Sequence, residues 1–329
     1  MRALVLTGPG QAEVQEVPAP VAAPGQVVVD VERVGVCGTD VEFFTGEMAY
    51  LHTGVARYPV RLGHEWCGRV ASVGAGVPGS WIGRRVTGDT MLGCGHCRRC
   101  RAGRHHVCAE RAEIGIQGPF HGALAEQLVV PVNALLELPD EVDATAGAMV
   151  EPGGNAWRAV NAAQVQAGER LLVLGTGAIG LLAAHFARAQ GIDVHLLGQY
   201  EAPGLEQAWT RDSLPELEWD GVIDATNAAA LPALALDLVE PGRRVVYIGL
   251  AGVPSTIDTR DLVLRDVTAV GILGASAGLA GAVAAYADGS VDPRPLVAAT
   301  VGLDRAGDVL GGWRPNDTSG PKMHIDPRV

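Results

Sequence analysis

Short apolar runs separated by Gly and Pro dominate the first 150 residues of the chain. Runs of this length, bounded by turn residues, are typical of β-strands. After Gly168 the pattern changes to an apolar run, a Gly-rich turn and a helix-like run, which predicts alternating strands and helices. We therefore expect a mainly β part followed by a parallel α/β part. The predicted strands are 26–36, 68–73 and 122–130 in the first part and 171–174, 193–197, 221–225 and 244–248 in the second, with helices at 179–190 and 231–239.

Two domains follow from this change of pattern and from the length of 329 residues. Beyond about residue 292 the chain is expected to leave the α/β part and return to the first domain. Prolines at 293, 295, 315 and 321 argue against a further regular βα unit there. The predicted division is residues 1–154 with 291–329, and residues 155–290.

The chain carries a formal net charge of −12. This acidity argues against nucleic acid and anionic membranes as partners and allows a small-molecule substrate. No apolar run reaches the ~20 residues of a membrane-spanning helix, and the apolar stretch 3–7 is too short for a secretory signal. Because four of the six cysteines are spaced for metal binding, we expect a reducing compartment and a cytoplasmic protein.

A closely spaced group of four cysteines gives the strongest chemical signal: Cys94, Cys97, Cys100 and Cys108. Two overlapping Cys-x-x-Cys steps and a fourth thiol match a closed tetrahedral zinc site. Redox dithiols and an iron–sulfur cluster with similar spacing are the alternatives. Four thiolates leave no coordination position open, so the pattern predicts a structural zinc and not a catalytic one.

A Gly-rich turn lies between the first strand of the α/β part and the helix that follows it. In this context G-x-G-x-x-G predicts a dinucleotide site, because the glycines let the backbone approach a pyrophosphate and the helix N-terminus offers unpaired N–H groups. An ordinary tight turn is the alternative. The residues expected to bind the cofactor are Gly175, Thr176, Gly177, Ala178, Ile179 and Gly180.

The second strand of the α/β part leads to Gly198, Gln199 and Tyr200, where a dinucleotide site usually has an acid that binds the ribose. The absence of an acid removes a charge that would repel a 2′-phosphate, but no Arg or Lys is present to attract one. We therefore expect NAD(P), with a slight preference for NADP. The short segment 198–219 also predicts a reduced edge of the nucleotide-binding domain.

A second group of candidate metal ligands gives a weaker signal than the four cysteines when each residue is taken singly. Cys37 and His64 are of the types that bind zinc, and Glu151 precedes the α/β part. Each also has an ordinary interpretation, as a small buried residue, a core histidine and a carboxylate at a helix start.

The order of these motifs resembles the zinc-dependent medium-chain dehydrogenases over nearly the whole chain. The resemblance rests on the segments around Cys37 and Gly63-His64-Glu65, the four cysteines, Glu151-Pro152, the Gly-rich turn and Asp224-Ala225-Thr226. It implies a GroES-like catalytic domain with a catalytic zinc, a Rossmann domain with a doubly wound parallel sheet, and hydride transfer between NAD(P) and a secondary alcohol. It also implies a homodimer or homotetramer, assembled through the apolar segment 267–273, which is otherwise an internal strand.

The same resemblance implies roles for single residues. The expected ligands of the catalytic zinc are Cys37, His64 and Glu151, with Glu65 as the uncertain fourth and Thr39 as a hydroxyl relay for the alcohol proton; Thr226, Gly249 and Leu250 are expected to contact the cofactor. One thiolate, one imidazole and one carboxylate cancel the charge of Zn²⁺, so a second carboxylate would weaken the ion as an electrophile. We therefore expect Glu65 to support the ligands, or to coordinate only when water or substrate leaves.

The substrate signals are mixed. Many members of the family, the threonine dehydrogenases included, have a relay His where this chain has Glu42. The segment 37–42 is more similar to the family's glucose dehydrogenases. The segment 151–156 resembles the threonine dehydrogenases, which usually have a His in place of Met91. With Gln117 and Asn155, Glu42 favours a polyol, sugar, cyclitol or amino alcohol.

Two other functions remain open from the sequence. The first is a threonine-type amino-alcohol dehydrogenase. The second is a non-enzymatic, nucleotide-binding regulatory protein that keeps only the structural zinc. The number of zinc ions per chain separates this second alternative from the enzymes.

Overall fold

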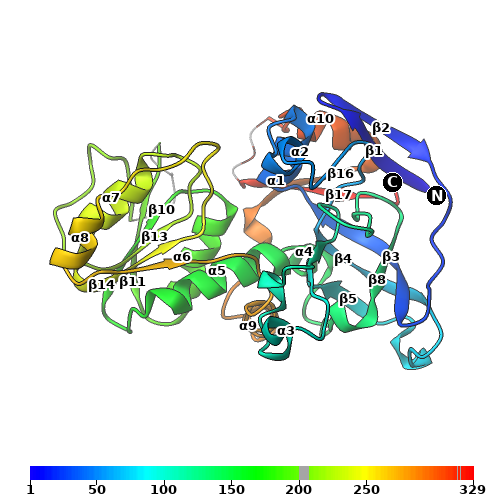
Figure 1. Cartoon of the computed structure of the whole chain (residues 1–329), viewed down its shortest axis with the longest axis horizontal. Coiled ribbons are helices and arrows are strands. Elements are labelled where there is room, and N and C mark those ends of the chain that lie inside the picture. The colour runs from blue at the N-terminus through cyan, green and yellow to red at the C-terminus, as the bar shows by residue number, and fades with distance from the viewer. Residues whose placement is uncertain (200–206, 317, 319) are drawn as a thin grey trace. The chain divides into compact units, whose positions relative to one another are not determined.

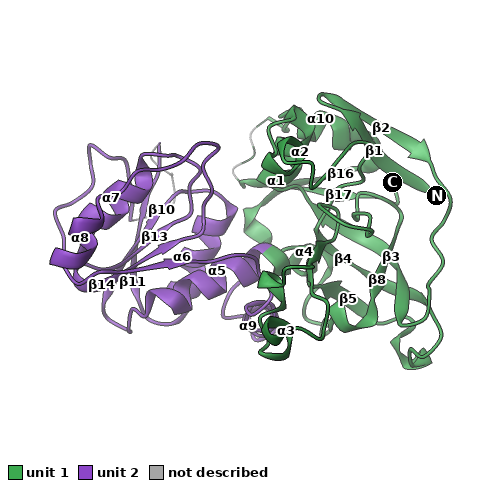
Figure 2. Cartoon of the chain, viewed as in Figure 1, with its two compact units in different colours: residues 1–151, 292–329 green, residues 152–291 purple. Residues whose placement is uncertain are grey.

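The structure is a computed structural model that describes residues 1–199, 207–316, 318 and 320–329. The chain forms two compact units, residues 1–151 with 292–329 and residues 152–291 (Figure 2). Unit 1 is mainly β, and unit 2 contains a parallel sheet with helices (Figure 1). This confirms the fold class that the sequence predicted.

Unit 1 is built on a sheet in the order β16-β17-β3-β4-β5-β9, with β8 also paired to β3. Apolar side chains of these strands pack with those of β1 and of the helices into one core, in which Leu6, Trp66 and Ile325 are fully buried. Two further pairs, β1 with β2 and β6 with β7, complete the strands described in this unit. Its strands are β1 (Arg2–Gly8), β2 (Gln11–Glu16), β3 (Gln26–Gly35), β4 (Glu65–Val73), β5 (Arg85–Gly88), β6 (Met91–Leu92), β7 (Ala112–Glu113), β8 (Gln127–Pro131), β9 (Leu135–Glu137), β16 (Val297–Gly302) and β17 (Lys322–Asp326).

The helices of unit 1 are short, and two of them follow metal-binding motifs of the sequence. Helix α1 begins directly after Cys37, and α3 begins directly after Cys97. The helical segments are α1 (Gly38–Thr45), α2 (Ala49–His52), η1 (Gly79–Trp81), α3 (Arg98–Arg101), η2 (His105–Val107), η3 (Val132–Ala134), α4 (Ala144–Ala148), η4 (Arg294–Leu296), η5 (Leu303–Arg305) and α10 (Ala306–Leu310); α5 (Val150–Ala163) begins in unit 1 and continues in unit 2.

The C-terminal segment differs from the sequence prediction. The prolines after residue 292 were expected to exclude a further βα unit, but β16 and β17 are parallel and are connected through η5 and α10. The expectation was wrong because the prolines lie outside both strands: Pro293 and Pro295 precede β16, and Pro315 and Pro321 precede β17. Strand β17 then pairs antiparallel with β3, next to the centre of the sheet.

Unit 2 contains a parallel sheet in the order β12-β11-β10-β13-β14-β15. This is the strand order of a doubly wound dinucleotide-binding fold, in which the order reverses beside the first strand. Most of the expected strands and helices are present within a few residues of their predicted bounds, and β14 begins earlier than predicted. The elements are β10 (Arg170–Leu174), α6 (Ala178–Ala189), β11 (Asp193–Leu197), β12 (Ala208–Trp209), β13 (Trp219–Asp224), α7 (Leu231–Leu238), β14 (Val239–Tyr247), α8 (Thr259–Leu264), β15 (Thr268–Gly271) and α9 (Leu279–Ala287).

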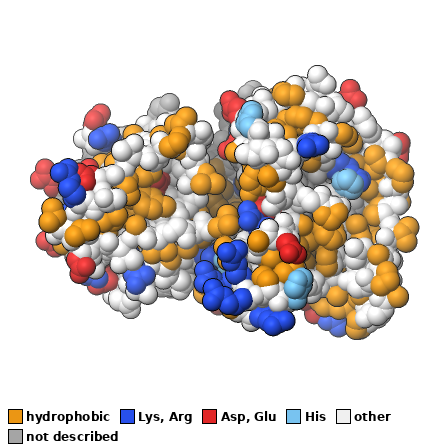
Figure 3. Space-filling view, viewed as in Figure 1, with side chains coloured by type: hydrophobic (Ala, Val, Ile, Leu, Met, Phe, Trp, Pro, Cys, Tyr) orange, Lys and Arg blue, Asp and Glu red, His pale blue; other side chains and the backbone are white. Residues whose placement is uncertain are grey.

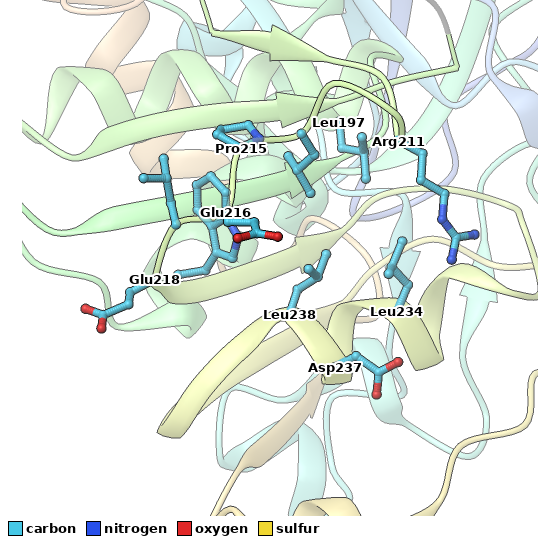
Figure 4. Close-up of a pocket in the computed structure, with 11 residues that line it drawn as sticks. Leu197, Arg211, Pro215, Glu216, Glu218, Leu234, Asp237 and Leu238 are labelled. Atoms are coloured by element: carbon cyan, nitrogen blue, oxygen red, sulfur yellow. The ribbon is translucent and has the colours of Figure 1, made fainter.

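One edge of the unit 2 sheet is reduced, as the short segment 198–219 predicted. Strand β12 has only two residues, and residues 210–218, which connect it to β13, contain no helix. Leu214 and Leu217 of this connection pack against the core beside Trp219. A cavity of about 530 Å³ remains between the connection and α7, with Leu234 and Leu238 along one side (Figure 4). A shortened connection thus covers the sheet here incompletely.

A buried histidine in β17 gives a prediction about stability. His324 is fully buried, and among the described residues neither ring nitrogen has a hydrogen-bond partner. Burial, and then the charges of Lys322 and Arg33, lower the pKa of His324 to about 3. Because the unfolded chain takes up a proton near the ordinary pKa of 6.5, the free energy of unfolding should fall as the pH drops from about 6.5 toward 3.

Replacing His324 by Leu should remove this fall in the free energy of unfolding at low pH. We expect the variant to be about 1–3 kcal/mol more stable than the parent near neutral pH, because an unsatisfied buried polar group is removed. At pH 5 the difference should grow by about 2 kcal/mol. Urea unfolding at the two pH values measures it, with His52→Leu at an exposed helix position as the control. Parallel pH profiles for the parent and H324L would contradict the prediction.

Candidate functional site

The four-cysteine segment of unit 1 brings its thiols together. The sulfur atoms of Cys94, Cys97, Cys100 and Cys108 all lie within 4.8 Å of one another. The Cys94–Cys100 and Cys97–Cys108 sulfur pairs are both 3.9 Å apart. A tetrahedral zinc with bonds of about 2.3 Å to sulfur places its ligands roughly 3.8 Å apart, so this arrangement fits the ion without a large movement.

The surroundings of these thiols suit their anionic form. The backbone N–H groups of Cys100 and Glu110 point to the sulfurs of Cys97 and Cys108, each at 3.4 Å. Arginine side chains gather on the surface (Figure 3) where Figure 1 places α3. The exposed arginines of this segment are Arg98, Arg99, Arg101 and Arg104. Their positive charges offset the net negative charge that a zinc tetrathiolate carries.

A second cluster in unit 1 joins Cys37, His64 and Glu65, whose ligand atoms lie within 4.8 Å of one another. Cys37 is the residue before α1, His64 is the residue before β4, and Glu65 is the first residue of β4. Gly63, at φ +101°, turns the chain into β4, and a side chain there would collide with the backbone N of Leu124 at 2.7 Å. Segments far apart in the sequence therefore place a thiol, an imidazole and a carboxylate around one point.

Asp40 contacts two of the three residues of this second cluster. It is fully buried, and its Oδ2 accepts a hydrogen bond from the backbone N of Cys37 at 2.9 Å. Its Oδ1 lies 3.5 Å from Nδ1 of His64, so the other ring nitrogen, Nε2, is left for a metal. Burial alone would lower the pKa of His64, but Asp40 and then Cys37 raise it well above its ordinary value. The same negative surroundings favour a bound cation.

Lys322 of β17 forms a buried ion pair with Glu65. Its Nζ lies 2.8 Å from both carboxylate oxygens of Glu65, and it also donates to the carbonyl of Val36 at 3.1 Å. The side chain of Glu65 lies over Gly35, where a Cβ would be 2.2 Å from Oε2. Both oxygens of Glu65 are therefore occupied by a lysine on the neighbouring part of the sheet.

Glu151 is not part of the three-residue cluster. It is buried in the first turn of α5, at the end of unit 1. Thr39 lies half-buried in the first turn of α1, two residues after Cys37. Their roles as metal ligand and hydroxyl relay stay predictions.

The predicted substrate residues belong to three different segments of the chain. Glu42 is half-buried in α1, where burial and then Glu47 raise its pKa. Asn155 lies on α5 in unit 2. Gln117 lies in unit 1 and donates to Oε1 of Glu113 at 2.7 Å.

Glu113 is the centre of a polar network that the sequence did not reveal. It is 3% exposed, and its Oε1 accepts hydrogen bonds from Nε of Arg111 at 2.7 Å and, more weakly, from the hydroxyl of Tyr50 at 3.4 Å. Within the described residues its Oε2 accepts none. A Cβ on Gly115, two residues after Glu113, would lie 2.9 Å from the carbonyl of Gly63, so this segment packs against the residue before His64. A buried carboxylate with one unused oxygen is therefore carried by a segment that contacts the neighbour of a candidate metal ligand.

The nucleotide motif in unit 2 has the geometry expected of it. Gly175 has φ +104°, and a Cβ on Gly180 would lie 1.9 Å from the carbonyl of Gly175, so only glycine allows this helix start. Gly177 is the N-cap of α6, and a Cβ there would meet nothing within 4 Å. Thr176, Ala178 and Ile179 are half-buried around it. The turn offers a free helix N-terminus with space for a phosphate.

The other predicted cofactor residues lie at the ends of neighbouring strands. Thr226 donates to the buried Asp224 through its N–H and hydroxyl groups, at 3.0 and 2.7 Å. Gly249 packs against Thr226, since a Cβ would be 1.8 Å from its carbonyl, and Leu250 is 80% exposed. After β11 come Gly198, half-buried, and Gln199, exposed. Tyr200 lies outside the described residues.

Sequence comparison places the chain among known dehydrogenases. Residues 23–140 match the family model for the alcohol dehydrogenase GroES-like domain. The L-threonine 3-dehydrogenase of Mesorhizobium japonicum is 30% identical over 278 residues, which cover 79% of this chain and 79% of the relative.

Solved structures agree. A protein from Sinorhizobium meliloti 1021, described as a zinc-binding dehydrogenase and bound to NADP, matches with a TM-score of 0.89 and 28% identity over 99% of both chains. A short chain alcohol dehydrogenase from Escherichia coli CFT073, complexed with NADH, has a TM-score of 0.90 and covers 99% of both chains; its 23% identity shows a shared fold.

These matches confirm the family and the class of NAD(P)-dependent alcohol dehydrogenase that the motifs predicted. They also agree with the chemistry of the two clusters, since a closed set of four thiols and an open set of mixed ligands are what structural and catalytic zinc sites require. The chain belongs to the zinc-dependent medium-chain dehydrogenase family.

Proposed function

We propose that this chain oxidises a secondary alcohol of a small polar substrate, with a catalytic zinc held by Cys37, His64 and Glu151 and a structural zinc held by the four cysteines. The observation that carries the proposal is the convergence of Cys37, His64 and Glu65 around one point, backed by the buried Asp40. In this proposal Glu151 is the third ligand and the only carboxylate that binds the zinc permanently.

A zinc ion at this site supplies a Lewis acid that favours loss of the proton from an alcohol. The side chains of the protein do the rest of the work. Asp40 keeps the ring of His64 in the tautomer and orientation that present Nε2. Thr39 is on the first turn of α1, two residues after Cys37. By its resemblance to the hydroxyl relay of the family, it is proposed to take the alcohol proton toward solvent. A nicotinamide cofactor bound at the glycine turn of unit 2 would supply the hydride acceptor.

Glu65 is proposed to support the site without being a permanent ligand. Its two oxygens already pair with Lys322, so coordination of a metal would have to loosen a buried ion pair. Burial lowers the pKa of Lys322, but Glu65, and then Cys37 and Asp40, raise it above its ordinary value, so the lysine balances the negative charge of all three residues. This arrangement supports the expectation that only one carboxylate binds the zinc permanently.

The glycine turn of unit 2 is proposed to bind the pyrophosphate of NAD(P), with a slight preference for NADP. The support is the absence of an acid at Gly198 and Gln199. Titration of the intrinsic fluorescence with NADH and NADPH tests the preference, and tighter binding of NADH would reverse it.

The substrate is proposed to be a polyol, sugar, cyclitol or amino alcohol. Glu113 supports this choice, because its unused Oε2 can accept a hydrogen bond from a hydroxyl or an ammonium group. A simple apolar alcohol would make no use of this acceptor. The relatives named L-threonine 3-dehydrogenase keep a threonine-type amino-alcohol substrate as the second candidate.

The test is a screen of polyols, sugars, cyclitols and amino alcohols, L-threonine included, for reduction of NAD⁺ and NADP⁺. Glu113→Gln should raise KM for the best polar substrate about 10- to 100-fold and change kcat less, because a hydrogen bond to a charged acceptor is weakened. Glu137→Gln, at a surface carboxylate, is the control. Activity confined to apolar alcohols, or an unchanged KM in E113Q, would reject the polar substrate.

We also propose that two copies associate through β15, as a dimer or as part of a tetramer. This strand is at the edge of the described sheet, and most of its residues are exposed. Val263, Leu264 and Leu250 of the same unit are 78%, 81% and 80% exposed. A mass of one chain in light scattering would contradict the association.

A cytoplasmic location is proposed from the cysteines. All six are free thiols, and a site of four thiolates needs a reducing compartment. In the described part of the chain, the helices are too short or too polar to span a bilayer.

A further inference from the structure

Two threonine hydroxyls hold the start of β4 where its pairing with β5 stops. Strands β4 and β5 pair only at Gly68 with Val86 and at Arg69 with Arg85. Beyond these pairs, the hydroxyl of Thr87 donates to the carbonyl of Trp66 at 2.7 Å, and that of Thr90 donates to the carbonyl of His64 at 3.1 Å. Both bonds are buried. The second fixes the backbone of a proposed zinc ligand.

Thr90 is itself fixed to the four-cysteine segment through its neighbour. The carboxylate of Asp89 accepts from the backbone N of Met91 at 2.9 Å and lies 2.6 Å from Nε2 of His105. His105 is between Cys100 and Cys108, and its carbonyl accepts from the backbone N of Cys108 at 2.9 Å. A continuous path therefore runs from a ligand of one metal site, through His105, Asp89 and Thr90, to a ligand of the other.

The backbone around Thr90 has little freedom to compensate. Its carbonyl accepts from the backbone N of Ile114 at 3.0 Å, and the N–H of Asp89 donates to the carbonyl of Ala134 at 2.8 Å. On the other side, the ring of His64 is limited by Asp40 at 3.5 Å. The imidazole is thus restrained at both its backbone and its ring.

We propose that Thr90 is a positioning residue for His64, and that the four-cysteine segment stiffens the second metal site through His105 and Asp89. The inference rests on the proposed function, because it assumes that Cys37 and His64 bind a metal. Groups that orient a metal ligand typically change metal affinity 10- to 100-fold when they are removed. Without the bond to Thr90, the peptide of His64 gains freedom that metal binding must then remove.

The test compares Thr90→Val with Thr87→Val. Each variant removes one buried bond from a threonine hydroxyl to a backbone carbonyl, but only the first concerns a ligand. In protein loaded with Co²⁺ at both sites, T90V should lose the metal of the Cys37 site to a chelator about tenfold faster than the parent, and T87V at the parent rate. Thr90→Ser keeps the hydroxyl and should restore the parent rate, which separates the bond from general packing.

A second pair of variants tests the path from the four-cysteine segment. His105→Leu should speed release from the Cys37 site several-fold while the absorption of the four-thiolate Co²⁺ persists. His96→Leu, at an exposed histidine of the same segment, should change neither. Equal release from T90V and T87V, or no effect of H105L, would overturn the coupling. If the parent protein binds only one metal per chain, the proposed catalytic site fails instead.

Discussion

Replacement of Cys37 by Ser, or of His64 by Ala, is expected to abolish alcohol oxidation while leaving binding of NAD(P)H largely intact. Both side chains are in the metal cluster of unit 1, whereas the glycine turn is in unit 2. Removing a Lewis acid worth several kcal/mol should lower kcat/KM on the order of a thousandfold or more. The zinc content should fall from two ions per chain to one, since the four-cysteine site is unchanged.

Cys67 provides the matched control for Cys37. It is fully buried, and burial raises its pKa to about 12, so it is expected to act as a small packing residue. Cys67→Ala should keep both zinc ions and most of the activity at a modest cost in stability. Full activity of C37S would refute the catalytic zinc. One zinc per parent chain, without activity, would instead favour a nucleotide-binding regulatory protein.

Replacement of Lys322 by Met is expected to lower the free energy of unfolding by about 3–5 kcal/mol. The reason is that Glu65, 1% exposed, would remain as a buried charge without its partner. The double variant Glu65→Gln with Lys322→Met should recover much of that loss, because neither charge is then left alone. Urea unfolding of the zinc-loaded protein measures all three proteins.

A surface ion pair gives the comparison for this prediction. Asp258 and Arg260 also form an ion pair, but the side chain of Arg260 is 82% exposed. Arg260→Met should therefore change the stability by less than about 0.5 kcal/mol. If K322M were as mild as R260M, the buried pair would have no structural importance, and the restraint proposed for Glu65 would lose its basis.

Short-range patterns made part of the fold and of the site predictable from the sequence. The turn from Gly175 to Gly180 and the four cysteines combine residues that are close in the chain, so local spacing was enough to predict their geometry. Asp40 is only three residues from Cys37, and an acid at that spacing could have been recognised as a partner of the ligands. It was missed because a carboxylate near a helix start has an ordinary capping interpretation.

Long-range pairings account for what the sequence did not predict. Lys322 meets Glu65 because β17 and β4 flank β3, and no local pattern encodes that adjacency. The surroundings of Glu113 depend on the pairing of β7 with β6, two strands of two residues each. The number of prolines after residue 292 does not predict the last βα unit, because these prolines lie outside both strands.

The position of β17 in the sheet has a consequence for synthesis on the ribosome. Cys37 and His64 leave the ribosome early, but Lys322 follows Glu65 by 257 residues, and the whole of unit 2 is translated in between. At a synthesis rate of about 5–20 residues per second, roughly 10–50 s therefore pass between the translation of Glu65 and that of Lys322. During that interval unit 2 can fold as a domain, while the nascent N-terminal segment has a free thiol and an unpaired carboxylate. A chaperone or a metal donor that acts on this protein would have its opportunity then, before the last strand enters the sheet.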